Sequence, residues 1–257
     1  RVDLCFGPRP EAFIRQLVAA VDHLLPPTPS ALWKERQLFF DLMKFGTKQV
    51  KNAPVAEVRT EQVELTKLPA LTSWPKDGGP FITLPLVYTE DPITKQHNIG
   101  MYRIQIYDDQ QTGIHWQIHK GGGFHYYEAE QRNEPLPVTL MLGGPPALTI
   151  TAIAPLPERV PELVFTSLLM NDKVHMYQEE GYAHPLVAEA EFAFGGLVPP
   201  HERKPEGPFG DHYGYYSLVH DFPVFNVKRM WRRKDAIYPA TVVGKPIQED
   251  YHIGDYL

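Results

Sequence analysis

Two runs of alternating residues flank a turn at 108–113 and carry side chains that could do chemistry. Because successive side chains of a strand point to opposite faces, each run has one apolar and one polar face. The apolar face comprises Tyr102, Ile104, Ile106, Ile114, Trp116 and Ile118. The polar face comprises Arg103, Gln105, Tyr107, His115, Gln117 and His119. A sheet with one face in water explains such alternation most simply. Arg, His and Gln instead of Lys, Glu, Thr and Ser favour the alternative, a lined pocket.

A second segment, 205–212, carries two carboxylates, Glu206 and Asp211. Neither helix nor strand spacing relates them, and the Gly-Pro turn between them could fold both toward one point. Paired carboxylates beside an Arg can hold different protonation states, which suits acid–base chemistry. The alternative is a surface turn with incidental acids, although Phe209 and the tyrosines that follow indicate partial burial.

Hydrophobic spacing predicts the elements that must position these residues. Apolar residues three and four apart predict helices over about 13–25 and 30–46, and short helices are expected near 124–131 and 162–170. The predicted strands are 80–88, 100–107, 113–119, 137–142, 186–194, 223–230 and 236–243. Residues 135–156 are uncharged, but prolines and glycines interrupt them, so a buried strand, a turn and a short helix are expected rather than a membrane span. Frequent strands with few long helices predict an α+β fold with a barrel-like or sandwich sheet.

Composition excludes several classes of protein. Hydrophobic residues make up 43% of the chain and charged residues 22%, which argues against disorder. A net charge of −6 argues against nucleic acid or an anionic membrane as the main partner. The single cysteine, Cys5, excludes a disulfide scaffold and a cysteine-based zinc cluster, and no signal peptide is recognised, so a cytoplasmic location is expected. The chain begins at Arg1 without an initiator Met, which suggests a piece of a longer protein.

Several separated motifs together resemble the UbiD-type decarboxylases, which use prenylated FMN. The motifs, in chain order, are Asn-Ile-Gly-Met-Tyr-Arg at 98–103, His-Lys-Gly-Gly at 119–122, Pro-Glu at 161–162, Glu-Gly-Pro-Phe-Gly-Asp at 206–211, Asp-Ala-Ile-Tyr at 235–238 and Gly-Lys-Pro at 244–246. Any one of them is weak evidence. Their order and spacing are hard to obtain by chance.

The resemblance implies a metal and a flavin site. Asn98, His119 and Glu162 would hold Mn²⁺ (or Mg²⁺) bridging to the cofactor phosphate, with K⁺ as a further possible ion. One amide oxygen, one imidazole and one carboxylate, with phosphate and water, suit an octahedral hard cation. The positions that contact prenylated FMN in relatives are Met101, Tyr102, Arg103, His115, Trp116, Gln117, Lys120 and Gly121. For Trp116, whose parity places it on the apolar face, a core position is the alternative.

By the same resemblance, Arg103, Glu206 and Asp211 form the catalytic set. Arg103 would dock the substrate carboxylate, Glu206 would position Arg103, and Asp211 would supply the proton after CO₂ leaves a substrate–flavin adduct. The proton donor would need a raised pKa, which burial beside a second carboxylate provides. The reaction would be a reversible, non-oxidative decarboxylation of an aromatic or α,β-unsaturated acid, by default a 4-hydroxybenzoate derivative as in ubiquinone biosynthesis. The alternatives are a flavin- or phosphate-binding module without turnover, or an inactive fragment.

The resemblance also implies an architecture and partners. The fold would be α+β with a central antiparallel split β-barrel, like that of FMN-binding flavin reductases, truncated at both ends. Residues 1–50 would be the helical remainder of an N-terminal α/β region, and 51–257 the cofactor-binding and catalytic domain. A flavin prenyltransferase would supply the cofactor, and the full-length protein would be a homo-oligomer without nucleic acid or a transmembrane segment.

The chain departs from the family pattern at one strand. Relatives usually carry a second Glu four residues after Glu191, where this chain has Gly195. Glu189 and Glu191 are expected on one solvated face without a catalytic role, and the basic run 232–234 in a solvated turn.

Overall fold

A computed structural model describes residues 44–117, 120–156 and 161–256, the last four without their side chains. The predicted helix at 13–25 and most of that at 30–46 lie outside these residues. Residues 44–46 are not helical, because the chain turns here into β1 (Thr47–Val50). This strand pairs in parallel with β9 (Val174–Tyr177), which pairs antiparallel with β10 (Leu186–Val187), to make a small three-stranded sheet.

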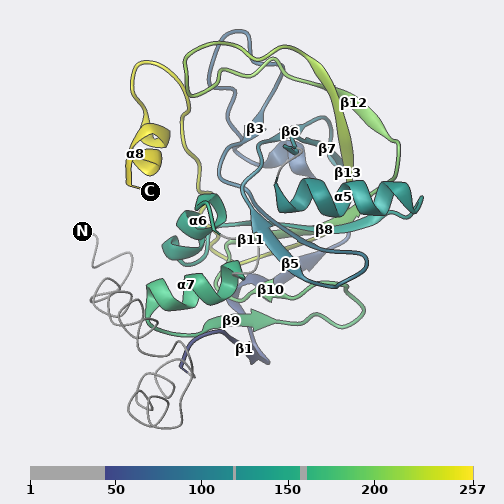
Figure 1. Cartoon of the computed structure of the whole chain (residues 1–257), viewed down its shortest axis with the longest axis vertical. Coiled ribbons are helices and arrows are strands. Elements are labelled where there is room, and N and C mark those ends of the chain that lie inside the picture. Colours follow the sequence, from purple (N-terminus) through teal and green to yellow (C-terminus); the bar gives the residue numbers. More distant parts are fainter. Residues whose placement is uncertain (1–43, 118–119, 157–160, 257) are drawn as a thin grey trace, which may run out of the picture.

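A ten-stranded sheet forms the body of the chain, and all its pairings are antiparallel. Its path runs β3 (Phe81–Ile82), β6 (Ile104–Ile106), β7 (Gln111–Ile114), β13 (His220–Arg232), β11 (Phe192–Val198), β8 (Leu136–Leu142), β4 (Leu86–Glu90) and β5 (His97–Gly100). Off this path, β2 (Val58–Thr60) and β12 (Arg203–Glu206) also pair with β13. The long strand β13 thus pairs with β2, β7, β11 and β12 (Figure 1).

The expectation of an α+β fold with an antiparallel sheet is confirmed, but the sheet does not close into a barrel. The path ends at β3 on one side and β5 on the other, and these two strands do not pair. β3 has only two residues, and its other pairing is a single bridge between Phe81 and Leu71. The strand is therefore too short to form the hydrogen bonds with β5 that would close a barrel.

Three helices pack against the sheets. α5 (Gly121–Gln131) lies on β4, β5 and β8, while α6 (Pro146–Ile153) and α7 (Glu162–Met170) pack side by side near the small sheet (Figure 1). Two 3₁₀ turns, η1 (Pro54–Ala56) and η2 (Leu65–Lys67), and a C-terminal helix, α8 (Glu249–Tyr256), complete the described elements. The predictions of helices near 124–131 and 162–170, and of a strand, a turn and a helix within 135–156, are confirmed. No helix among the described residues is long and apolar enough to cross a membrane.

The predicted strand at 236–243 is wrong, because side chains rather than a neighbouring strand satisfy its backbone. Thr241 N donates to Thr83 Oγ1 at 3.0 Å and Val242 N donates to Glu249 Oε2 at 3.0 Å. The carbonyl of Val243 accepts Trp74 Nε1 at 2.6 Å. The predicted strands at 137–142 and 223–230 exist and are longer than expected, as β8 and β13. The others are divided or shifted in their bounds; the 113–119 run, for example, is a strand only as far as Ile114.

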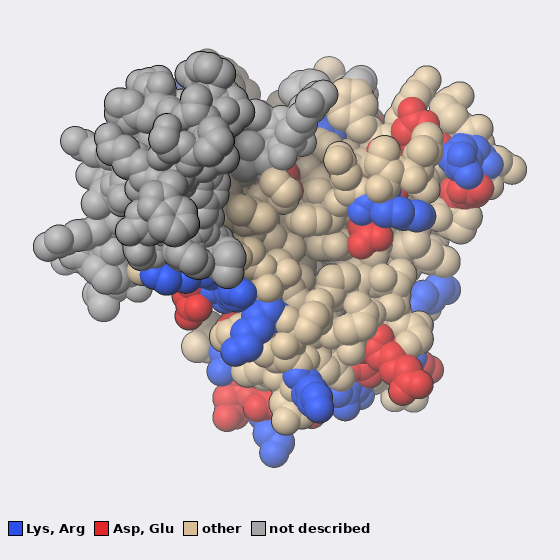
Figure 2. All heavy atoms as spheres, turned by 60° about the horizontal axis from the view of Figure 1, so that its bottom comes forward, with Lys and Arg blue, Asp and Glu red and all other residues tan. Residues whose placement is uncertain are grey.

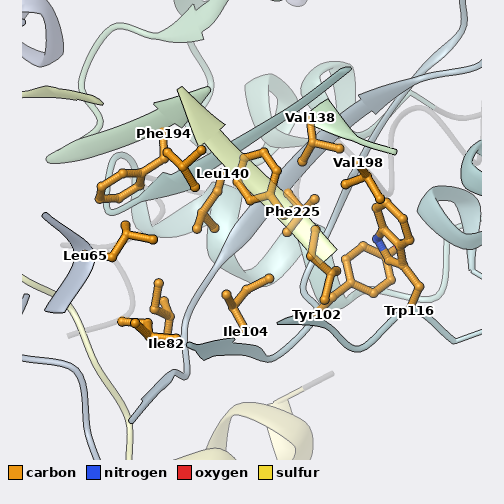
Figure 3. Packing of buried hydrophobic residues seen from close by; sticks show 14 of the residues in the cluster. Leu65, Ile82, Tyr102, Ile104, Trp116, Val138, Leu140, Phe194, Val198 and Phe225 are labelled. Carbon is orange, nitrogen blue, oxygen red and sulfur yellow. The ribbon is translucent and has the colours of Figure 1, made fainter. Parts of the chain in front are cut away.

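Buried apolar residues form two clusters, one of which fills the curve of the large sheet (Figure 3). The described residues of the predicted apolar face all belong to it: Tyr102, Ile104, Ile106, Ile114 and Trp116. Facing strands supply partners such as Val138, Leu140, Phe194 and Phe225. The surface carries charged side chains of both signs, and on the face drawn in Figure 2 basic and acidic side chains are interspersed.

Candidate functional site

Arg103 and Glu206 form a bidentate ion pair in the interior. Arg103 Nε donates to Glu206 Oε1 at 2.7 Å, and Nη2 donates to Oε2 at 2.9 Å. The carboxylate is 0% exposed and the guanidinium 14%. Nη2 also donates to Ser217 Oγ at 3.2 Å, and the ring of Phe209 lies 4.9 Å from the guanidinium carbon. The two parallel hydrogen bonds to Glu206 and the ring of Phe209 hold the guanidinium in one plane.

Two other residues of the predicted polar face contact Glu206 or the residue that follows it. His115 Nδ1 lies 3.2 Å from Glu206 Oε2. Gln105 Nε2 donates to the carbonyl of Gly78 at 2.9 Å, and its Oε1 accepts the N–H of Gly207 at 2.7 Å. Gln105 is 5% exposed, so this face is not a solvated one. The interpretation of a fully solvated face is therefore wrong for Arg103, Gln105 and His115, whereas Gln117 is exposed, and the lined pocket stays a prediction.

Glu206 is held in its ionised form. Burial by itself raises the pKa of a carboxyl, but the hydrogen bonds from His115 and Arg103 and the charge of Arg103 outweigh it, and the pKa of Glu206 lies below its ordinary value. An ionised carboxylate can only accept hydrogen bonds, which suits a residue that orients Arg103 and not one that donates a proton.

Asp211 does not join Glu206. Its Oδ1 accepts His212 N at 2.7 Å and lies 2.6 Å from His212 Nδ1, and its side chain is 39% exposed. Asp211 N donates to the carbonyl of Tyr215 at 2.9 Å, and Gly210 N donates to Asp77 Oδ1 at 2.8 Å. These two bonds close a tight loop around Asp211, and no hydrogen bond among the described residues joins its carboxylate to Glu206. The convergence of the two acids therefore stays a prediction.

A small cavity of about 100 Å³ lies at Asp211. Its lining comprises Trp74, Gly210, Asp211, Gly214, Tyr215, Tyr216, Gly244 and Lys245. The segment 206–217 separates this cavity from the ion pair, because Ser217 and Phe209 contact Arg103 while their neighbours Tyr216 and Gly210 line the cavity.

A second group of polar residues surrounds the hydroxyl of Tyr102. Gly122 N donates to Tyr102 Oη at 3.1 Å, and Asn98 Nδ2 lies 3.5 Å from the same oxygen. A Cβ on Gly121 would fall 2.2 Å from Asn98 Oδ1, so only glycine lets the start of α5 approach this amide. Asn98 on β5 and the first turn of α5 are therefore neighbours, 23 residues apart in the sequence.

Glu162 at the start of α7 lies close to the same strand. Its carboxyl accepts a hydrogen bond from the backbone of Ile99, yet burial is the larger effect and raises its pKa. Its charge contributes, after burial, to the raised pKa of Tyr102, which places the carboxyl near that hydroxyl. The predicted ligands Asn98 and Glu162 thus converge, whereas His119 lies outside the described residues.

The two described donors, Asn98 and Glu162, are of the chemical type that the predicted metal uses. A nearby cation would favour the ionised form of the buried Glu162, and amide and carboxylate oxygens are ligands for hard divalent ions. Lys120 precedes α5 in extended conformation, and no side chain caps the helix, whose first three residues are glycines. Its N–H groups suit a phosphate. Within the described part of the chain, no group of three or more His, Cys, Asp and Glu side chains could hold a metal.

The remaining predicted cofactor residues are spread around this region. Met101 is half-buried, and its N–H donates to the carbonyl of Ala152 at 3.2 Å. Trp116 is 7% exposed, lies 5.0 Å from the ring of Tyr126, and belongs to the core, as its parity indicated. Its buried Nε1 has no hydrogen-bond partner among the described residues. Gln117 and Lys120 are exposed.

Comparison with known sequences connects this geometry to a family. Residues 47–246 match the UbiD family model described as the 3-octaprenyl-4-hydroxybenzoate carboxy-lyase Rift-related domain. The chain belongs to the UbiD family. It is 51% identical, over its whole length, to a protein of Chlamydia pneumoniae that is named as a subunit of 4-hydroxybenzoate decarboxylase. It spans 44% of that relative, so it corresponds to somewhat less than half of the relative's chain.

Two solved UbiD-family structures share the fold. The closed form of vanillic acid decarboxylase from Sedimentibacter hydroxybenzoicus superimposes with a TM-score of 0.79 at 26% identity, covering 88% of this chain and 50% of that one. An evolved dimeric form of HmfF from Pelotomaculum thermopropionicum, in complex with prFMN, gives a TM-score of 0.73 at 27% identity, covering 78% and 48%.

The departure from the UbiD pattern at Gly195 has a packing reason. A Cβ at Gly195 would lie 2.0 Å from the hydroxyl of Tyr182, so the tyrosine occupies the space of a longer side chain. Glu191 is not solvated as expected: it is 16% exposed, its Oε1 pairs with Arg233 at 3.0 Å, and its Oε2 accepts Ile237 N at 3.0 Å. Arg233, in the predicted solvated turn, is 40% exposed and is the ion-pair partner of Glu191. Glu191 and Arg233 are too far apart in the sequence for local spacing to predict their ion pair, and the same is true of the contact between Ser217 and Arg103. For Gln105 there was a signal, its position on the polar face of the 102–119 region.

Proposed function

We propose that the protein containing this chain is a carboxy-lyase that removes CO₂ from an aromatic or α,β-unsaturated carboxylic acid without net oxidation. The buried bidentate pair of Arg103 and Glu206 carries this proposal. A buried guanidinium fixed in one plane is a site for a second carboxylate, and its immobilisation before the substrate arrives reduces the entropy lost on binding.

In this proposal Arg103 binds the substrate carboxylate. Glu206 occupies Nε and Nη2, so the Nη1 side of the guanidinium is the one for which no protein partner is found among the described residues. Phe209 stacks on the guanidinium and excludes water from one face. Glu206 stays ionised and keeps the guanidinium aligned while the carboxylate is lost.

Prenylated FMN is the proposed cofactor, with Mn²⁺ or Mg²⁺ as the divalent ion and K⁺ as a further proposed ion. When bound, this flavin supplies the electron sink for decarboxylation, while the protein supplies orientation and charge. Asn98 and Glu162, with His119 as the third proposed ligand, would hold the divalent ion, and the glycines at the start of α5 would bind the phosphate. Met101, Tyr102, His115, Trp116, Gln117, Lys120 and Gly121 are the remaining proposed contacts.

Asp211 is the proposed proton donor. It lies on the same loop as the residues that contact Arg103, and its carboxylate has His212 Nδ1 at 2.6 Å and a cavity beside it. A 4-hydroxybenzoate derivative is the proposed default substrate, in line with the name of the chlamydial relative. A flavin prenyltransferase and a homo-oligomeric assembly are the proposed partners, with 1–50 and 51–257 as separate regions.

The test is expression of the complete protein together with a flavin prenyltransferase, followed by a screen of aromatic and unsaturated acids for CO₂ release. We expect a modified-flavin absorbance, about one divalent ion per chain, and turnover of at least one phenolic acid. Cofactor binding without turnover of any acid would favour the second candidate, a flavin- or phosphate-binding module. The observation that favours this candidate is that the partly exposed carboxylate of Asp211 pairs with His212, with no bond to Glu206 among the described residues. Binding of neither flavin nor metal would overturn the proposal.

A further inference from the structure

His115 contacts a protein carboxylate rather than facing only the flavin site. Its Nδ1 lies 3.2 Å from Glu206 Oε2, the oxygen that also accepts Arg103 Nη2. Because Glu206 is ionised and can only accept, the hydrogen of this bond must sit on His115 Nδ1. Each oxygen of the buried carboxylate thus has a donor from Arg103, and Oε2 has a second one from His115.

Two further contacts fix the histidine in place. His115 N donates to the carbonyl of Arg103 at 3.2 Å, which joins the backbones of the two residues that hold Glu206. The imidazole packs on the ring of Phe222 in β13, with the centroids 4.1 Å apart. His115, Arg103 and Glu206 therefore form a closed triangle in which each corner is tied to the other two.

The triangle has a consequence for Arg103. A carboxylate held by the guanidinium alone can rotate with it as one unit, since the pair constrains only the relative geometry of its two members. The hydrogen bond from His115 removes that freedom, because the carboxylate must then accept hydrogen bonds from Arg103 and from His115 at the same time. A hydrogen bond to a charged group is stronger than one between neutral groups, so it favours one orientation of the carboxylate over the alternatives.

We propose that His115 is a positioning residue for the decarboxylation: by donating from Nδ1 to Glu206 it fixes the plane of the carboxylate that aims Arg103. This inference rests on the proposed function, because it assigns Arg103 to the substrate carboxylate. It gives His115 a role distinct from direct contact with the flavin.

Asn and Leu at position 115 provide a matched test in the full-length enzyme loaded with cofactor. The two side chains have nearly the same shape, and Asn Nδ2 can replace the imidazole Nδ1 as a donor while Leu cannot. We expect His115→Leu to lower kcat/KM by about 10–100-fold, the loss of one hydrogen bond to a charged group, with flavin content unchanged. His115→Asn should retain about 10-fold or more of the activity that His115→Leu loses, because it keeps the donor to Glu206. Flavin absorbance and melting temperature are measured for every variant.

The other outcomes overturn the proposal. If both variants match the wild type, the contact with Glu206 does not matter for the reaction. If both lose activity and flavin equally, His115 acts as a cofactor contact; if both lose activity with flavin retained, the imidazole itself is required, for instance in proton transfer. His115→Ala replaces the Leu variant should the latter not fold, and the same loss is expected. A wild-type enzyme that decarboxylates no acid would instead refute the proposed function and is distinguished by that control.

Discussion

Gln105 holds the segment of Glu206 in place through the backbone of Gly207. Its Oε1 accepts the N–H of Gly207 at 2.7 Å, and its Nε2 donates to Gly78 at 2.9 Å. A Cβ on Gly78 would meet the carbonyl oxygen of Gly207 at 2.1 Å, so the two backbones touch directly beside this amide. The side chain that joins them is buried and lies two residues after Arg103 in the same strand region.

Replacing Gln105 with Met should destabilise the protein through this contact. The change removes the side-chain hydrogen bonds to the N–H of Gly207 and to the carbonyl of Gly78, which costs about 1–3 kcal/mol and lowers the melting temperature by roughly 3–8 °C. Gln105→Glu keeps the acceptor for Gly207 but places a carboxylate oxygen against the carbonyl of Gly78 at a buried position, so a loss at least as large is expected. Thermal unfolding followed by circular dichroism measures both. Equal melting temperatures for Gln105→Met and the wild type would show that water replaces the amide.

Arg103→Lys tests whether the planar fork matters or only its charge. Lysine has a single ammonium and cannot form two parallel bonds with Glu206 while offering a further edge to a substrate. We expect a fall in kcat/KM of at least about 100-fold, with modified flavin still bound. Steady-state kinetics and the flavin spectrum of the purified holoenzyme measure these effects. A lysine variant with near wild-type turnover would mean that Arg103 does not dock the carboxylate.

Local sequence patterns predicted those elements and buried positions that depend on residues close together in the sequence. The two-residue period placed Ile104, Ile106 and Ile114 in the core, and Pro161 before Glu162 marked the start of α7. The same alternation put Arg103 and His115 on one side, where the structure brings both to Glu206.

Non-local pairing was the part that the sequence could not predict. Glu191 and Arg233 meet across 42 positions, and nothing in their immediate neighbours distinguishes them from surface residues. The open sheet follows from how few residues β3 contributes, and the loop of Asp211 is closed by the contact of Gly210 with Asp77, 133 residues away. Short-range spacing carries no information on such contacts.

Buried histidines should make the fold sensitive to acid. Burial lowers the pKa of His184 to about 4, aided by the charge of Lys95, and also lowers those of His97 and His125. The unfolded chain takes up these protons near pH 6.5. The folded protein takes them up only at lower pH, so stability falls as the pH decreases from 6.5 toward 4.

The size of this effect is measurable at His184. One such group contributes up to about 1.4 kcal/mol per pH unit in this window. His184→Asn can keep a partner for Thr139, which lies 3.1 Å from Nδ1, and should reduce the difference between the melting temperatures at pH 7 and pH 5. The exposed His252 on α8 serves as the control, because its replacement by Gln should leave that difference unchanged. An unaltered difference in the His184 variant would contradict the assignment.

Gly121→Ala should separate metal binding from folding. The new Cβ would fall 2.2 Å from Asn98 Oδ1, and the flexible end of the Asn98 side chain can move away without disturbing the backbone. We therefore expect the melting temperature of the cofactor-free protein to change by no more than ~3 °C, while the affinity for Mn²⁺ falls by about 10-fold or more as one oxygen ligand is displaced. Calorimetric titration with Mn²⁺ measures the loss, and Asn98→Leu should reproduce it. Full Mn²⁺ affinity in both variants would remove Asn98 from the proposed ligand set, whereas loss in the Leu variant alone would show that the start of α5 can shift to accommodate a methyl group.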